Sequence, residues 1–174
     1  MSEVAQTLKG MDAFKEMVAA AKAQAEAAKE AVEAEAQQTL DEASGKHRQR
    51  MSACVDAAYI IASADGSTSV EEVVHIADKL CGLTDGEVDA SFVRTLIDEA
   101  QAKVERDGRD AVIASIGARC TTPNEREMAF LVAGNVSWTG GGIGTQEGLA
   151  LQAIARAFGW EISHMHKVLA RARA

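Results

Sequence analysis

The segment IIASADGSTSVEE, residues 60–72, decides the fold that we expect for this chain. Its apolar first half continues a helical face that begins at Met51, and Asp65-Gly66 is a strong turn signal. Ser69 and Glu72 then have the spacing of a capping box, in which the serine hydroxyl accepts from a backbone N–H and the glutamate reaches back. The segment therefore predicts a helix, a tight turn and a second helix, which together make a helical hairpin.

A second segment, LVAGNVSWTGGGIGTQEG at residues 131–148, follows the same plan. An inward-facing helix leads to Gly140-Gly141-Gly142, Thr145 is expected to cap the next helix, and Glu147 lies in its first turn. The two segments are about 75 residues apart, which suits two helical hairpins packed as pseudo-symmetric halves better than a solenoid repeat. We expect Asp65 and Gly140 to lie at matching corners.

The remaining turn and capping signals divide the chain into one long helix and a series of short ones. Ser44-Gly45 is expected to end the long helix. A second capping box at Thr122 and Glu125 has proline at the first helical position, where its missing N–H is tolerated. The pattern predicts an all-α bundle of about seven short helices over residues 46–174.

Apolar residues within these short helices recur at helical spacing and are expected to face the core. In the helix that starts after Ser69, the inward set begins at Val70, and Gly82 is expected to cap the end. In the helix that starts after Thr122, the inward set begins at Met128.

Residues 1–45 form a separate part of the chain, an alanine-rich helix. Residues 2–43 contain thirteen alanines and no proline, a composition that strongly favours helix. A helix of about 40 residues is roughly 60 Å long, so two arrangements stay open. The first half packs on the domain, or residues 1–43 self-associate into a structural homo-oligomer. The residues expected to pack on the domain are Leu8, Met11, Phe14 and Val18, and a heptad seam recurs at Val4, Met11, Val18, Ala25 and Val32.

Composition excludes several classes of protein. Eighteen Lys and Arg against 26 Asp and Glu give a net charge of −8, which disfavours contact with nucleic acid. The chain has no apolar run of signal-peptide or membrane-spanning length, so we expect no direct membrane insertion and a cytoplasmic location. Three widely spaced cysteines indicate reduced thiols in a reducing compartment: Cys54, Cys81 and Cys120.

The paired motifs resemble the TerB family of tellurite-resistance proteins, which also includes the N-terminal domain of certain membrane-anchored DnaJ-like proteins. The resemblance covers residues 47–172 and rests on an A-x-A-D-G-x-x-x-x-E-E pattern ending at Glu72 and an x-A-x-x-[LF]-G-[LFW] pattern ending at Trp160. It implies an all-α bundle of about seven or eight helices, with acidic turns associated with metal binding and stress resistance. The long alanine-rich helix is not part of the family pattern.

The resemblance implies a metal site at the first acidic turn, formed by Asp65, Glu71 and Glu72, for a weakly bound divalent cation (Ca, Mg or Zn). The second turn departs from the family, because Gly140-Gly141 stands where a second Asp-Gly is expected and Glu147 is the one acid that remains.

The residues themselves allow two interpretations of the first turn. Asp65-Gly66 and Glu72 have the spacing of the second half of an EF-hand loop, but Ile61 and Ser63 occupy the places of its first carboxylates, which excludes a high-affinity calcium loop. Either the acids serve only the turn and the helix start, or they form a weak metal or acidic docking site.

Trp138, beside the glycines of the second turn, is expected to be either a lid over the core or an exposed anchor, and we assign partner binding to Trp138 and Glu147. His164 and His166 are two residues apart, which does not place two metal ligands on one helical face. No side chain stands in a recognised nucleophile setting, so we expect no enzyme.

Together these features favour a non-enzymatic stress-response or scaffold module that binds a protein partner, such as a membrane-associated stress complex. The alternative is a homo-oligomer assembled through the N-terminal helix.

Overall fold

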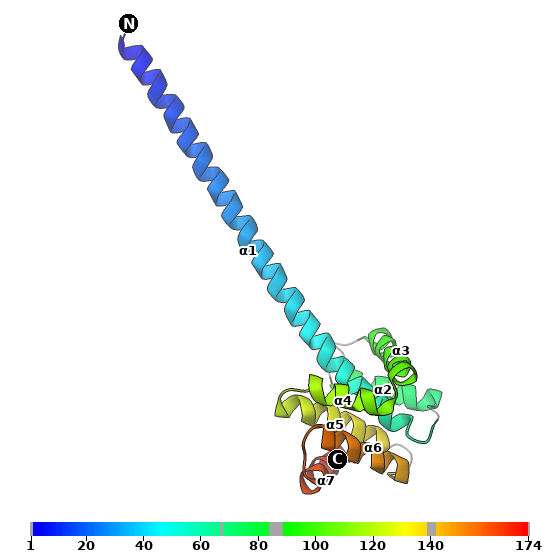
Figure 1. Ribbon diagram of the computed structural model, residues 1–174. Coiled ribbons are helices and arrows are strands. Elements are labelled where there is room, and N and C mark those ends of the chain that lie inside the picture. The colour runs from blue at the N-terminus through cyan, green and yellow to red at the C-terminus, as the bar shows by residue number, and fades with distance from the viewer. Residues whose placement is uncertain (1, 67, 84–88, 139–141, 174) are drawn as a thin grey trace. The chain divides into compact units, whose positions relative to one another are not determined.

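The computed structural model describes residues 2–66, 68–83, 89–138 and 142–173 (Figure 1). Within these ranges it describes the side chains from residue 16 onward. Within these residues the chain forms seven helices and no strand, so the expected all-α class is confirmed. The helices are α1 (Ser2–Ala62), α2 (Val70–Leu83), α3 (Ala90–Asp107), α4 (Arg109–Arg119), α5 (Pro123–Ser137), α6 (Thr145–Ala157) and α7 (Ile162–Ala172).

The first helix continues through the residues that were expected to end it. α1 runs from Ser2 to Ala62, so the prediction that Ser44-Gly45 ends a helix is wrong. A glycine inside a helix costs only about 1 kcal/mol relative to alanine, and the strong helix formers on both sides outweigh that cost. Residues 51–62 are therefore the last part of α1, and six helices follow α1 in the described chain where seven were expected.

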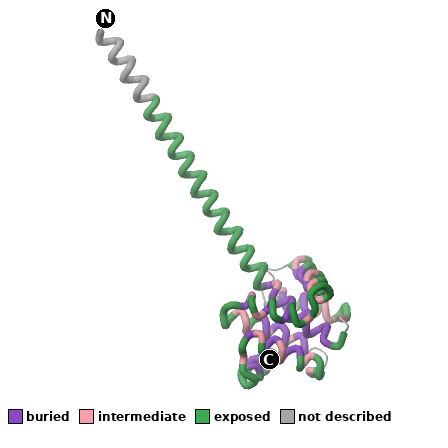
Figure 2. The backbone as a smooth tube through the Cα atoms, viewed as in Figure 1, coloured by how far each residue is buried: buried purple, intermediate pink, exposed green. Residues whose placement is uncertain are grey.

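The chain divides into two compact units, Met1–Lys46 and His47–Ala174. In the first unit, every side chain described, from residue 16 to residue 46, is exposed (Figure 2). Val18, one of the residues expected to pack on the domain, is 49% exposed, and the side chains of Leu8, Met11 and Phe14 lie outside the described set. The large apolar side chains that are exposed here are Met17, Val18, Val32 and Leu40.

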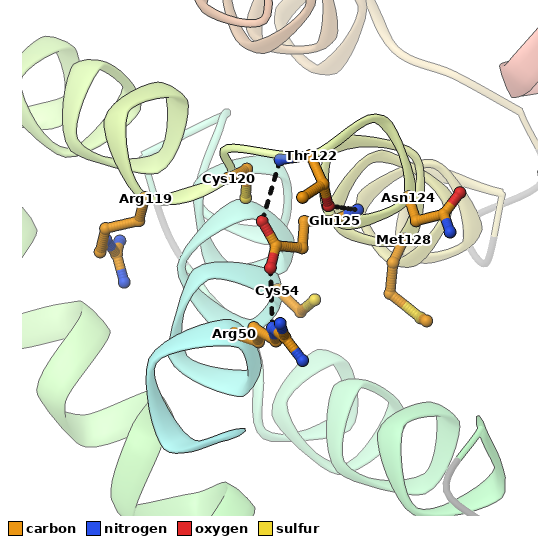
Figure 3. Close-up of a pocket in the computed structure, with 8 residues that line it drawn as sticks. All are labelled: Arg50, Cys54, Arg119, Cys120, Thr122, Asn124, Glu125 and Met128. Atoms are coloured by element: carbon orange, nitrogen blue, oxygen red, sulfur yellow. Dashed lines mark hydrogen bonds and ion pairs between the residues drawn. The ribbon is translucent and has the colours of Figure 1, made fainter. Parts of the chain in front are cut away.

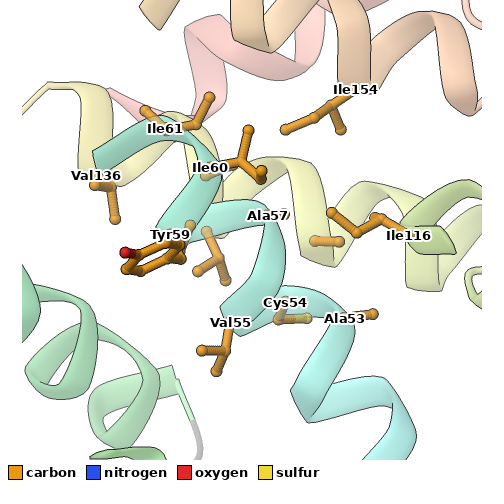
Figure 4. Close-up of a cluster of buried hydrophobic side chains, with 14 of the residues drawn as sticks. Ala53, Cys54, Val55, Ala57, Tyr59, Ile60, Ile61, Ile116, Val136 and Ile154 are labelled. Carbon is orange, nitrogen blue, oxygen red and sulfur yellow. The ribbon is translucent and has the colours of Figure 1, made fainter. Parts of the chain in front are cut away.

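The core of the second unit is built around the last part of α1. Every residue from 53 to 64 is buried, whereas the sequence pattern indicated burial of one face only. Ile60 and Ile61 lie among Ile116 of α4, Val136 of α5 and Ile154 of α6 (Figure 4). A helix that is apolar all round belongs at the centre of a bundle, because each of its faces removes apolar surface from water.

The two capping boxes form as the sequence predicts. The Ser69 N–H donates to Glu72 Oε2 at 2.7 Å, and the Glu72 N–H donates to Ser69 Oγ at 3.1 Å. At the start of α5, Thr122 and Glu125 make the same reciprocal pair, with Pro123 at the first helical position. These motifs are predictable because all of their partners lie within one turn of the chain.

Two helix boundaries differ from the prediction. Gly82 lies inside the last turn of α2, and Gly144, not Thr145, is the N-cap of α6. The α6 cap depends on Glu147, whose Oε2 accepts from the Gly144 N–H at 2.6 Å. A glutamate at the third helical position can hold the N-cap backbone without a capping hydroxyl, so the expected role of Thr145 is not needed.

Four residues that helical spacing assigns to core-facing positions are exposed: Val70, Val74, Met128 and Ile162. Val70 is 79% exposed because it is the first residue of α2, and the buried stripe of that helix begins later, at Ile76. Met128 is 52% exposed because it borders a cavity beside α5.

Gly117 sets the distance between α4 and α6, two helices in contact with each other. A Cβ atom at Gly117 would lie 2.7 Å from the Ala157 carbonyl oxygen. That separation is well inside van der Waals contact, so this crossing requires a residue without a side chain.

Aromatic and cationic contacts hold the chain around α7. The Trp160 ring centroid lies 5.2 Å from that of Phe130 and 4.6 Å from that of His164. The Arg173 guanidinium carbon lies 5.3 Å from the centre of the Trp138 ring, a cation–π geometry. Both tryptophans therefore contact the last helix or the residue that follows it.

In the described part of the chain, no helix combines the length and the apolar character that crossing a bilayer requires.

Candidate binding site at the two acidic corners

The turns that follow α1 and precede α6 line one cavity of about 350 Å³. The first turn contributes Asp65 and the first turn of α2 contributes Glu72, while Glu147 comes from the start of α6. Three carboxylates expected from the sequence therefore line the same cavity, although up to 82 positions separate them. We call this cavity the corner pocket, and its lining is Ile61, Ala62, Asp65, Glu72, Gly142, Gly144, Thr145, Gln146 and Glu147.

The Asp65 turn is held by backbone bonds and by an arginine from another helix. Ala64 N–H donates to the Ile61 carbonyl at 3.0 Å, and Gly66, with a φ of 100°, donates to the Ser63 carbonyl at 3.1 Å. Arg109 of α4 donates to the carbonyls of Ser63 and Ala64. The positive φ explains why glycine follows the aspartate, because an L side chain is strained in that region.

The two glutamates of the corner pocket have the same local role. Each is the third residue of its helix, and its Oε2 accepts a hydrogen bond from the backbone N–H of the N-cap residue. Glu72 accepts from Ser69, and Glu147 accepts from Gly144. Both helix N-termini therefore carry a carboxylate near their positive dipole ends, which is an electrostatically favourable arrangement. Each carboxylate has a second oxygen that its cap bond does not use.

Two of the residues assigned to sites from the sequence lie elsewhere. Glu71 is exposed and does not line the corner pocket, so the expected trio Asp65, Glu71 and Glu72 is not brought together as a set. Trp138 is half-buried, ends α5 as its C-cap and lies under Arg173, outside the pocket lining. The Gly140 corner falls outside the described residues.

The described residues that line the pocket give it an acidic character. Its three ionisable lining residues are all carboxylic acids, and the rest are apolar, glycine, threonine or glutamine. Across residues 2–66, 68–83, 89–138 and 142–173, no three His, Cys, Asp or Glu side chains form a group arranged to hold a metal ion. The arrangement suits a ligand that brings positive charge and hydrogen-bond donors, since carboxylate oxygens only accept.

One buried charge was missed by the sequence reasoning. Asp56 of α1 is 0% exposed and accepts from Lys103 Nζ at 3.0 and 3.1 Å, and from Arg119 Nη2. Ser52 Oγ completes the group by accepting from both cations. The signal was present, because Asp56 is the one charged residue between positions 53 and 64, and an unpaired charge would not be stable there.

A scan against protein-family models, a search of curated proteins and a search of solved structures each find no match to this chain.

Proposed function

We propose that residues 47–172 act as a TerB-like, non-enzymatic binding module in a stress-response or scaffold assembly. In this proposal the corner pocket is the recognition site for a cationic group on a protein partner. The observation that carries it is the presence of Asp65, Glu72 and Glu147 in the lining of one cavity, from turns far apart in the sequence.

Charge supports a cationic ligand. With three carboxylates and no basic side chain among the described residues that line it, the pocket attracts a lysine or arginine side chain, and charge-assisted hydrogen bonds to carboxylate oxygens hold it. A volume of about 350 Å³ is enough for one such side chain. The chain's overall charge of −8 adds long-range attraction for a basic partner.

The same oxygens are also the ligands that hard divalent ions prefer. Asp65, Glu72 and Glu147 offer carboxylates, and Thr145 and Gln146 add neutral oxygens to the lining. We include a weakly held Ca, Mg or Zn ion in the proposal. It shares the site with the basic group of the partner, and the two compete.

The test measures ion and peptide binding to the full chain. Calorimetric titration with calcium, magnesium and zinc is paired with melting curves, and an ion at tenfold its Kd raises the free energy of unfolding by about 1.4 kcal/mol. The probe for the partner group is a short lysine-rich peptide, with a glutamate-rich peptide of equal length as the comparison.

Two variants locate the binding. Asp65→Asn and Glu147→Gln remove charge while the amide oxygen of glutamine can still accept the cap hydrogen bond, and both are expected to weaken binding of the lysine-rich peptide. Glu71→Gln, one residue from Glu72 but outside the pocket, is the matched control. Absence of heat and an unchanged Tm at millimolar ion would remove the metal. Equal effects of Glu71→Gln and Glu147→Gln would remove the pocket itself.

A second function is favoured by the exposed apolar residues of the first unit. We propose as the alternative that the N-terminal helix assembles a homo-oligomer, because Val18 and Val32 are 49% and 66% exposed and lie two heptads apart. Light scattering on the full chain measures its mass. A Val18→Lys, Val32→Lys double variant is expected to lower that mass to one chain, and a Gln24→Lys, Gln38→Lys double variant is the control. A monomer in all three proteins rejects this alternative.

A further inference from the structure

A second cavity, of about 290 Å³, lies between the last part of α1, the end of α4 and the start of α5 (Figure 3). Three sulfur-bearing side chains line it: Cys54 from α1, Cys120 just after α4, and Met128 from α5. We call it the sulfur pocket. Its other lining residues are Arg50, Arg119, Thr122, Asn124 and Glu125.

The two thiols of the sulfur pocket are buried and reduced. Cys54 and Cys120 are 6% and 3% exposed, and neither forms a disulfide. Burial raises the pKa of the Cys54 thiol to about 12, and it also raises the pKa of Cys120. At neutral pH both are therefore protonated and poor nucleophiles. An ion that binds them must displace their protons.

The charges around the sulfur pocket favour an anionic complex. The positive charge of Arg119 lowers the pKa of both thiols and that of Arg126 lowers the pKa of Cys120, in each case against the larger effect of burial. Glu125, which raises the pKa of both thiols, is paired with Arg50 at 2.7 Å.

Asp56, whose negative charge also raises the pKa of Cys54, is paired with Lys103 and Arg119. Among the described residues that line the pocket, Arg50 and Arg119 face one carboxylate, that of Glu125. Replacement of two thiol protons by one monovalent cation therefore leaves a complex whose negative charge is compensated.

We propose that Cys54 and Cys120 bind a soft monovalent metal ion of the copper(I) class, with the thioether of Met128 as a third donor. Thiolate and thioether sulfur select such ions over hard divalent cations, which prefer oxygen. Zinc requires four ligands in a structural site, whereas two or three sulfur donors satisfy a soft monovalent ion. Met128 is flexible and half in solvent, which suits a donor that closes over an entering ion.

The binding step is a proton exchange without a change in oxidation state. Two S–H bonds break, two sulfur–metal bonds form, and two protons pass to solvent, while the ion enters and stays in the +1 state. This site is independent of the corner pocket, so failure to bind copper(I) would not affect the proposed function.

The experiment titrates copper(I) into the reduced full chain under anaerobic conditions, against a chromophoric copper(I) chelator. We expect one ion per chain and a sulfur-to-metal absorption band in the near ultraviolet. Cys54→Ser and Cys120→Ser each weaken apparent affinity by on the order of a hundredfold or more, and Met128→Leu by about tenfold. Cys81→Ser is the matched control, because Cys81 is a half-buried thiol outside the pocket lining. Its affinity is expected to be unchanged.

Proton release gives a test that needs no substitution. While both thiols are protonated, the apparent Kd should fall about a hundredfold for each pH unit, and two protons should appear per ion bound. The groups that set this dependence are the ones named above: Arg50, Arg119, Arg126, Lys103, Asp56 and Glu125. Circular dichroism and Tm of each serine variant separate loss of a ligand from loss of the fold.

Three results would overturn the proposal. They are loss of binding in Cys81→Ser equal to that in Cys120→Ser, retention of full affinity in both pocket-cysteine variants, and release of fewer than two protons by the unaltered chain.

Discussion

One helix of this protein lies in two opposite environments. From residue 16 to residue 50 every residue of α1 is exposed, and from residue 53 to its end at Ala62 every residue is buried. The backbone conformation is the same in both parts, since α1 is continuous from Ser2 to Ala62. The comparison teaches that helix is maintained here by two different causes, intrinsic propensity in the exposed part and burial of apolar surface in the other.

Composition explains the difference. The exposed part is made largely of alanine, glutamate, lysine and glutamine, which lose little side-chain freedom in a helix. The buried part contains the β-branched Val55, Ile60 and Ile61, which are poorer helix formers and gain their stability from tertiary packing. A substitution should therefore have opposite consequences in the two parts.

The largest expected effect comes from truncating a side chain in each part. Ile60→Ala removes a side chain that is 0% exposed and leaves a cavity, so we expect a loss of about 4 kcal/mol in the free energy of unfolding. Val32→Ala removes a side chain that is 66% exposed and installs a better helix former, so the change should stay within about 0.5 kcal/mol. Urea unfolding followed by circular dichroism measures both. Similar losses in the two variants would contradict the comparison.

The next effect concerns the one charge in the buried part. Asp56→Ala leaves Lys103 and Arg119 without their shared carboxylate, and since both cations are about a quarter exposed we expect a loss near the lower end of the usual range, about 3 kcal/mol. Glu99→Ala is the control, because its partner Arg48 and Glu99 itself are both exposed, and such pairs contribute about 1 kcal/mol or less. Thermal unfolding of the two variants should separate them, and equal Tm values would remove the buried network as a source of stability.

A third prediction concerns the end of the exposed part, where Arg50 pairs with Glu125. Backbone hydrogen bonds from Thr122, with further bonds from Arg50 and Thr121, lower the pKa of Glu125 to about 2 from an ordinary 4.5. A depressed carboxyl pKa contributes stability that is complete above the unfolded value and is lost as the pH falls through the folded value. The loss from this group therefore falls between about pH 4.5 and pH 2.

Glu125→Gln removes that titration. The variant should be less stable than the natural chain near neutral pH, and the two should converge as the pH approaches 2. Urea unfolding across the acid range measures the difference. A constant gap between the two proteins down to the lowest pH would contradict the assignment.

The smallest effect tests whether α1 is continuous. Gly45 has no atom within 4 Å of the position that a Cβ would take. Gly45→Ala should therefore stabilise the helix by about 0.5–1 kcal/mol and slow amide exchange around residue 45. If the helix ended at this glycine with a positive φ, alanine would instead reduce helicity, and that result would restore the original sequence interpretation.

Local signals in the sequence were sufficient for much of the fold. The caps at Ser69 and Thr122 were predictable because hydroxyl and glutamate are three residues apart, and the helices follow from apolar periodicity. The sequence does not show that the helix continues through Gly45, because whether one glycine ends a helix depends on the helix propensity of its neighbours. Here the neighbours are strong helix formers.

The sites were predictable only in part. Asp65, Glu72 and Glu147 could be named from their turns, but the sequence did not show that they line one cavity, which depends on packing between segments far apart. Packing between distant segments is also why the sequence did not show two further features. These are the hydrogen bonds from Arg109 to the Asp65 turn, and the presence of Cys54 and Cys120 in the lining of one pocket. Contacts across 45 to 82 residues have no local pattern from which to infer them.

The two tryptophans of the chain give it a built-in optical probe. Trp160 meets the edge of His164 in α7, and Trp138 lies under Arg173, which directly follows that helix. Detachment of α7 would bring both indoles into water and shift their emission to longer wavelength. The natural fluorescence of the protein therefore reports whether its last helix is docked, without a dye or an introduced label.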